Sequence, residues 1–252
     1  MIDYAPMLTL AVLLVRPGVL MMVAPCFGGS FLPAQVKIGL AVLLALLLAP
    51  TVTVLEIGGS GVLMLVVMRE AAIGFALGLA MSAFIAAVEL AGHLAGFQLG
   101  LSYSAIVDPQ SGVRNNVVSV LYMNLTLVAF LLANGHHAFL RALTASYQDV
   151  PVGFGRIGPT LGDSVVALLG LVFTLGVRLA APLVLVLLVC ELAIGLISRV
   201  APMLNLMAVA APARLLIGLV LLGVMAPIIA RTASSVIDMV LQLGVAGAQA
   251  FR

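Results

Sequence analysis

Charged side chains inside long apolar runs are the residues of this sequence that could do chemistry. Seven of them interrupt stretches made mostly of Leu, Val, Ala and Gly: Arg16, Arg69, Glu70, Glu89, Arg178, Glu191 and Arg214. One charge at the centre of a bilayer costs about 3 kcal/mol or more, so seven unpaired charges would not be tolerated there. Each charge must pair, face a water-filled path, or lie outside the hydrocarbon.

Arg69 and Glu70 illustrate the constraint. Adjacent residues on a helix point in different directions, so these two cannot pair with each other on one helix face. Each therefore needs a partner on another helix or another chain. Two interpretations stay open: the charges form structural ion pairs between helices, or they line a transport path.

No catalytic signature accompanies these charges. His136 and His137 are adjacent, so they cannot share a helix face as a zinc-protease pair does. The run Gly100-Leu101-Ser102-Tyr103-Ser104 begins like a nucleophile elbow but lacks the closing Gly. A phosphate-binding loop is absent, and a net charge of +2 without a basic run does not favour nucleic-acid binding. We expect no enzyme activity, no cofactor and no metal.

The composition predicts the elements that must position the charges. Of 252 residues, 64% are hydrophobic and only 8% are charged, with a single Lys, Lys37. Soluble proteins average about 25% charged residues, so this chain could not cover a water-exposed surface. We predict an all-α membrane protein with six or seven hydrophobic segments, at about 6–24, 36–55, 62–90, 117–133, 164–197, 203–230 and, more weakly, 233–250.

Several segments do not match a simple bilayer span. Residues 164–197 would form a helix about 50 Å long, whereas the hydrocarbon core is about 30 Å thick. The helix must break or project beyond the membrane, and Pro182 is the predicted break. Pro17, Pro212 and Pro227 interrupt other apolar runs. Kinked helices and helical hairpins therefore fit better than straight spanning helices.

Small residues form a second pattern. They recur at every fourth position and resume after a short offset, at Gly74, Gly78, Ser82 and Ala86 and then at Gly92, Gly96 and Gly100. Such rows let helix backbones approach closely in lipid. The row predicts helix packing, either within the chain or against neighbouring subunits.

Two stretches are polar enough to be predicted loops. They are 102–116, which contains the turn-forming Asp108-Pro109 followed by Gly112, and 134–162. A polar break directly after the glycine row is tolerable at membrane depth only if it lines a cavity or is buried in protein. We therefore expect the stretch at about 100–116 to carry function.

An ordered series of short motifs runs along essentially the whole chain. The amino-terminal half has Arg16, Ala24-Pro25-Cys26-Phe27-Gly28, Pro33 and Lys37, then Glu70 with Gly74 and Gly78, and Gln98, Gly100 and Asp108-Pro109. The carboxyl-terminal half has Asn134-Gly135-His136, Ala181-Pro182 and the block from Gly195 to Asn205, which contains Ser198-Arg199 and Pro202. In their order and spacing these motifs resemble those of the FliR family of flagellar export proteins and its virulence-system counterparts, SctT. Met203 departs from the family, which usually has Gln there.

The resemblance implies a spiral gate built from helical hairpins of several subunits. It implies FliP-like and FliQ-like partners, with an FlhB-like subunit, and a plug formed by the segment matching residues 100–116. Tyr103 and Ile106 fall where the plug carries bulky apolar side chains, and Asp108-Pro109 shapes its turn. Buried-charge or structural roles are expected for Arg16, Glu70, Arg178, Glu191, Arg199, Pro202 and Asn205.

The prediction from these observations is one export-gate domain over residues 1–252. Its function would be flagellar biosynthesis by type III protein export, as a non-enzymatic subunit of the bacterial inner membrane, in contact with lipid and with unfolded substrates. The alternative is a secondary transporter of ions or small molecules that uses Glu70, Glu89 or Glu191 with an intramembrane Arg. Inverted repeats would favour the transporter, and the sequence has no convincing internal repeat.

Overall fold

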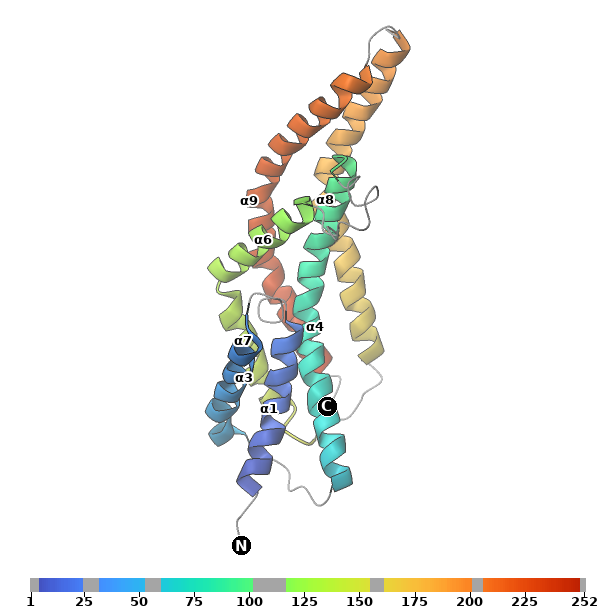
Figure 1. The fold of residues 1–252 in the computed structure, drawn as a ribbon. Helices are drawn as coiled ribbons and strands as arrows, with labels where there is room; N and C mark the ends of the chain where they lie inside the picture. The colour runs from blue at the N-terminus through green and yellow to red at the C-terminus, as the bar shows by residue number, and fades with distance from the viewer. Residues whose placement is uncertain are drawn as a thin grey trace. The chain divides into compact units, whose positions relative to one another are not determined.

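The described part of the protein is helical. A computed structural model describes residues 5–24, 32–52, 60–101, 117–154, 161–200 and 206–249, and its regular elements are helices (Figure 1). They are α1 (Ala5–Val23), α3 (Ala34–Leu48), the short 3₁₀ helix η1 (Ala49–Thr51), α4 (Ser60–Gln98), α6 (Val117–Leu132), α7 (Gly135–Asp149), α8 (Leu161–Val200) and α9 (Leu206–Gln249). The all-α prediction is confirmed.

Within these residues, three helical stretches are long and apolar enough to cross a membrane: Gly61–Gln98, Gly162–Val200 and Ala210–Ile229. A fourth span results if α6 and α7 count as one broken span. The prediction of a membrane protein is therefore confirmed as well.

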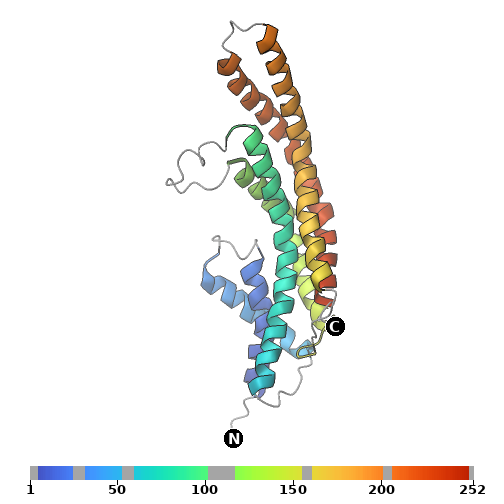
Figure 2. The same ribbon diagram turned by 90° about the vertical axis from the view of Figure 1, so that its right-hand side faces the viewer.

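The chain forms two compact units. The first contains residues 1–84, 134–170 and 236–252, and in it α1 packs against α3. The second contains residues 85–133 and 171–235. In the second unit the carboxyl-terminal part of α8 lies beside the amino-terminal part of α9, in the orange part of the ribbon in both views (Figures 1 and 2).

The predicted break at Pro182 is wrong. Helix α8 has 40 residues and continues through Pro182, and α1 and α9 likewise continue through their prolines. A proline removes one backbone hydrogen bond, and in apolar surroundings packing on both sides of it can hold the helix together. Leu179, Leu183 and Leu187 are buried on one face of α8, before and after the proline. The segments expected at 203–230 and 233–250 likewise form the single helix α9.

The polar stretch 134–162 is not simply a loop, as predicted, because residues 135–149 form α7. Asn134 precedes this helix in a left-handed conformation, with φ of 56°. The helix is amphipathic: its buried side chains, at spacings of three and four residues, are Phe139, Ala142, Leu143, Ser146 and Tyr147. His137, Arg141, Thr144 and Gln148 are exposed on the opposite face, and these polar residues interrupt any apolar run in the segment.

Candidate functional site

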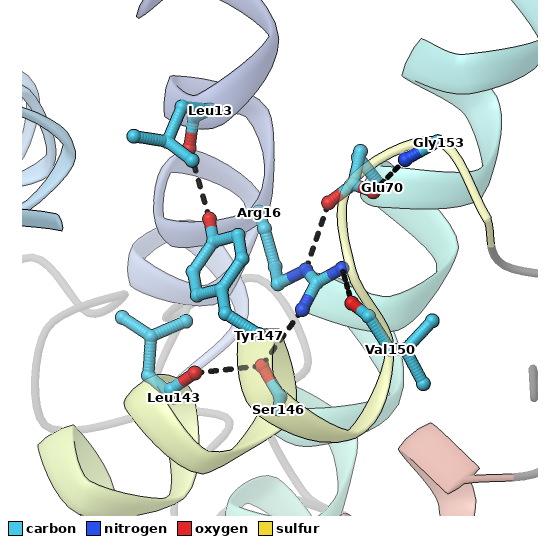
Figure 3. A network of polar contacts seen from close by, with 8 residues as sticks. All are labelled: Leu13, Arg16, Glu70, Leu143, Ser146, Tyr147, Val150 and Gly153. Carbon is cyan, nitrogen blue, oxygen red and sulfur yellow. Dashed lines mark hydrogen bonds and ion pairs between the residues drawn. The ribbon is translucent and has the colours of Figure 1, made fainter. Parts of the chain in front are cut away.

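The central feature of the first unit is a buried ion pair between α1 and α4. The Nε–H of Arg16 donates to Oε2 of Glu70 over 2.8 Å (Figure 3). Both side chains are 0% exposed. Glu70 thus has the partner on another helix that its position beside Arg69 requires.

The other donors of Arg16 reach α7 and the turn that follows it. Nη1 donates to the Ser146 hydroxyl over 3.0 Å, and Nη2 donates to the backbone oxygen of Val150 over 3.0 Å. The Ser146 hydroxyl itself donates to the Leu143 carbonyl over 2.7 Å. The guanidinium carbon lies 4.1 Å from the centre of the Tyr147 ring, a cation–π arrangement.

Two further hydrogen bonds close this network (Figure 3). Oε1 of Glu70 accepts the backbone N–H of Gly153 over 3.3 Å, and the Tyr147 hydroxyl donates to the Leu13 carbonyl over 3.0 Å. The network therefore joins α1, α4, α7 and the turn after α7. Both charged groups are fully enclosed, and their hydrogen bonds connect these three helices and the turn to one another.

Glu70 begins a stripe on α4 that packs against α1. Its next members at every fourth position are Gly74, Gly78 and Ser82. A Cβ on Gly74 would lie 2.5 Å from the backbone oxygen of Arg16, and one on Gly78 would lie 2.7 Å from Cβ of Val23. The Ser82 hydroxyl donates to the Val23 carbonyl over 2.9 Å. Gly74 and Gly78 thus serve packing within the chain.

The later glycines of the row have different surroundings. A Cβ on Gly92 would overlap the backbone of Ser119 in α6, so this glycine also allows close helix packing in the second unit. Gly96 is buried. Gly100 ends α4 with φ of 77°: its N–H bonds to the Phe97 carbonyl over 3.1 Å and the Leu101 N–H bonds to the Gly96 carbonyl over 3.1 Å. That pair of bonds is a Schellman motif, so Gly100 terminates the helix instead of extending the packing row.

The remaining predicted charges lie in the second unit. Glu191 of α8 and Arg214 of α9 form an ion pair of 3.0 Å, and each side chain is 34% exposed. Arg178 and Arg199 are exposed in this chain, so their expected buried or structural role stays a prediction that requires a partner outside it. Glu89 lies 3.8 Å from His93, with both side chains partly exposed.

The predicted plug and two residues of the carboxyl-terminal motif lie outside the described residues. They are Tyr103, Ile106, Asp108 and Pro109, and Pro202 and Asn205.

Six residues of the Arg16 network were not predicted from the sequence: Leu13, Leu143, Ser146, Tyr147, Val150 and Gly153. The signal for two of them was present, because Ser146 and Tyr147 lie on the buried face of an amphipathic helix. Backbone groups such as the Val150 carbonyl leave no trace in a sequence.

Sequence comparison with known proteins identifies the family of this chain. The family described as bacterial export proteins, family 1, matches residues 7–240. The chain belongs to this family. It is 34% identical over 223 residues to the flagellar biosynthetic protein FliR of Pectobacterium carotovorum, covering 85% of this chain and 83% of that protein. FliR of Escherichia coli K12 is 32% identical over 218 residues (86% and 84%), and FliR of Bacillus subtilis 168 is 30% identical over 216 residues (82% and 82%).

These matches confirm the predicted membership of the FliR family and the predicted role in flagellar biosynthesis and protein export. The alternative of a small-molecule or ion transporter receives no support from them. Together with its apolar helices, the family makes the chain a membrane-embedded component of the flagellar export apparatus.

Proposed function

We propose that this chain is a non-enzymatic structural subunit of an export gate in the bacterial inner membrane, through which unfolded proteins pass. Its partners in the gate are FliP-like and FliQ-like subunits, together with an FlhB-like subunit. The whole chain, residues 1–252, acts as one export-gate domain despite its two compact units.

The observation that carries this proposal is the length of the uncovered apolar surface. Large hydrophobic side chains are exposed along α8 from Val165 to Val200, and along α9 from Leu215 to Ile228. A 40-residue helix is about 60 Å long, whereas the hydrocarbon core of a bilayer is about 30 Å thick. Lipid therefore covers only about half of the exposed face of α8, and other apolar chains must cover the rest.

Co-purification tests this proposal. The chain is expressed with and without its FliP-like and FliQ-like partners and extracted in mild detergent. Size-exclusion chromatography with light scattering then measures the molar mass of the species that elutes. We expect a hetero-oligomer with the partners and aggregation or loss without them. A monodisperse monomer or homo-oligomer that ignores the partners would contradict the proposal.

We further propose that the segment at about 100–116 plugs the closed gate. It follows the Schellman end of α4 at Gly100, and it carries the bulky side chains Tyr103 and Ile106 ahead of the Asp108-Pro109 turn. Bulky apolar side chains can close a narrow pore by excluding water, and displacement of a short loop would open it.

If this segment plugs the gate, removing its bulky side chains should make the membrane leak small solutes. Replacing Tyr103 and Ile106 together by Gly in the assembled gate should make membranes permeable to small solutes, because the apolar constriction is lost. Solute efflux from cells or proteoliposomes measures this permeability. The matched control is Ser104→Gly, which replaces a small polar residue of the same segment. Unchanged permeability with normal assembly would count against the plug.

A further inference from the structure

The exposed face of helix α7 is made of polar side chains. Four of them follow one another at spacings of four, three and four residues, which places them on one side of the helix. They are His137, Arg141, Thr144 and Gln148. Every other α-helix in the described part of the chain exposes large hydrophobic side chains, whereas α7 exposes none. The surroundings of α7 therefore differ from those of the other helices.

The apolar face of α7 is already covered by the chain itself. Phe139 and Leu143 are buried on that face. Ser146 and Tyr147 of the same face contact Arg16, as Figure 3 shows, and these contacts fix the rotation of the helix. An amphipathic helix lies on a membrane by inserting its apolar face among the acyl chains. Helix α7 has no free apolar face to insert, so only its polar face meets the surroundings.

Hydrocarbon is an unsuitable medium for this polar face. Arg141 is exposed and forms no ion pair within the described part of the chain. Its guanidinium stays charged and has five N–H donors, and the amide of Gln148 adds two more donors and an acceptor. The Thr144 hydroxyl is satisfied locally, because it donates to the Arg141 carbonyl over 2.8 Å. Acyl chains offer the remaining groups no hydrogen bonds, and an unpaired charge among them is strongly disfavoured.

We propose that the exposed face of α7 borders water in the assembled protein, so that α7 does not belong to a lipid-covered span formed with α6. Water hydrates the Arg141 guanidinium and the Gln148 amide directly. A covering protein surface would instead have to bring a matched polar group for each of them. This inference depends on the embedding of the chain in a membrane and not on the hetero-oligomeric gate, so it holds or fails separately from the proposed function.

Cysteine reactivity tests the proposal, because a maleimide reacts with the thiolate, which forms in water and not in hydrocarbon. The native Cys26 and Cys190 are replaced by Ser, and single cysteines are introduced by Thr144→Cys, Gln148→Cys and, as the control on α6, Val128→Cys. The Val128 side chain is 56% exposed and belongs to an apolar face. Membranes that contain the assembled export apparatus are treated with N-ethylmaleimide, and mass spectrometry measures the labelling rate.

Each labelling rate is divided by the rate of the same variant unfolded in SDS. We expect a ratio near one for both α7 cysteines and a ratio below about 0.1 for the α6 control, because only the α7 thiols ionise. Ratios below about 0.1 at both α7 positions overturn the proposal, because lipid or another subunit then covers this face.

A second pair of variants tests the same point without labelling. Gln148→Lys adds a charge to the polar face of α7, and Val128→Lys adds one to an exposed apolar position of α6. Water hydrates a lysine, whereas hydrocarbon and packed interfaces disfavour it, so we expect Gln148→Lys to keep the wild-type amount of protein in the membrane and Val128→Lys to lower it about fivefold or more. Quantitative immunoblotting of membranes measures both amounts. A loss of Gln148→Lys as large as that of Val128→Lys overturns the proposal.

Discussion

Removing Glu70 should have a large effect on stability, because its partner would stay buried. Arg16 and Glu70 are both 0% exposed. In Glu70→Leu, the charge of Arg16 loses its counter-ion while keeping its bonds to Ser146 and Val150, and the N–H of Gly153 loses its acceptor. Removing one member of a buried ion pair typically costs about 3–5 kcal/mol. We expect the free energy of unfolding to fall by about that amount.

The double variant Arg16→Met with Glu70→Leu should be less harmful than the single one. Both charges are then gone, and the remaining penalty is that of the unpaired Val150 carbonyl and Gly153 N–H, about 1–3 kcal/mol each at most. The Gly153 N–H is unpaired in both variants, so they differ by the uncompensated buried charge of Arg16 in one and the unpaired Val150 carbonyl in the other. Because the buried charge costs more than one neutral carbonyl, we expect the double variant to be the more stable, a positive coupling between the two positions.

Equilibrium unfolding in mixed micelles, followed by far-UV circular dichroism during SDS titration, measures both effects. Glu89→Leu is the matched control: it removes an acid from the same helix, but that side chain is 43% exposed and its ion pair is weak. The control should change stability by less than about 1 kcal/mol. The reasoning is refuted if Glu70→Leu costs no more than Glu89→Leu, or if the double variant is as unstable as the single one.

Two further predictions concern glycines. Gly74→Ala should lower the thermal unfolding temperature and cost about 1–3 kcal/mol, because the new Cβ would lie 2.5 Å from the backbone oxygen of Arg16 and force α1 away. The control is Gly61→Ala on the same helix, where a Cβ would have nothing within 4 Å, so this variant should be neutral or stabilising. An equal loss of stability in both variants would contradict the packing role of Gly74. Gly100→Ala should cost about 1–2 kcal/mol in the same assay, because φ of 77° strains an L-residue. Gly195→Ala in α8 is its control, and a Gly100→Ala variant as stable as that control would show that the Schellman turn is not required.

Much of the fold was predictable because it depends on local properties. Apolar length and composition predicted the membrane class and the bounds of α1, α6 and α8 within about three residues. They also predicted where α3 and α4 begin, but the predicted carboxyl-terminal ends of these two helices, residues 55 and 90, differ from the observed Leu48 and Gln98. The same approach failed at α7, whose amphipathic pattern is shorter and more polar than a membrane span. It also failed at Pro182, because the packing that holds the two halves of α8 together is not a property of the segment itself.

The candidate site was predictable only in part. A charge in an apolar run must have a partner, so the sequence indicated that Glu70 pairs with another helix. Its partner, Arg16, lies 54 residues away in the sequence, so the pairing depends on how α1 and α4 are rotated and packed against each other. It depends also on the turn after α7, whose Val150 carbonyl accepts from Arg16 and whose Gly153 N–H donates to Glu70. The row of small residues predicted close approach, but it did not distinguish α1 from another subunit as the neighbour.

The sequence by itself determined that this chain is a helical membrane protein of the bacterial export family, because composition, segment length and ordered motifs are written along the chain. Only the tertiary structure decided how its charges are used. It encloses Arg16 and Glu70 completely, leaves Glu191 and Arg214 one-third exposed, and exposes Arg178 and Arg199. Solvation of a charge depends on what packs around it in three dimensions, and residues distant in sequence supply those neighbours.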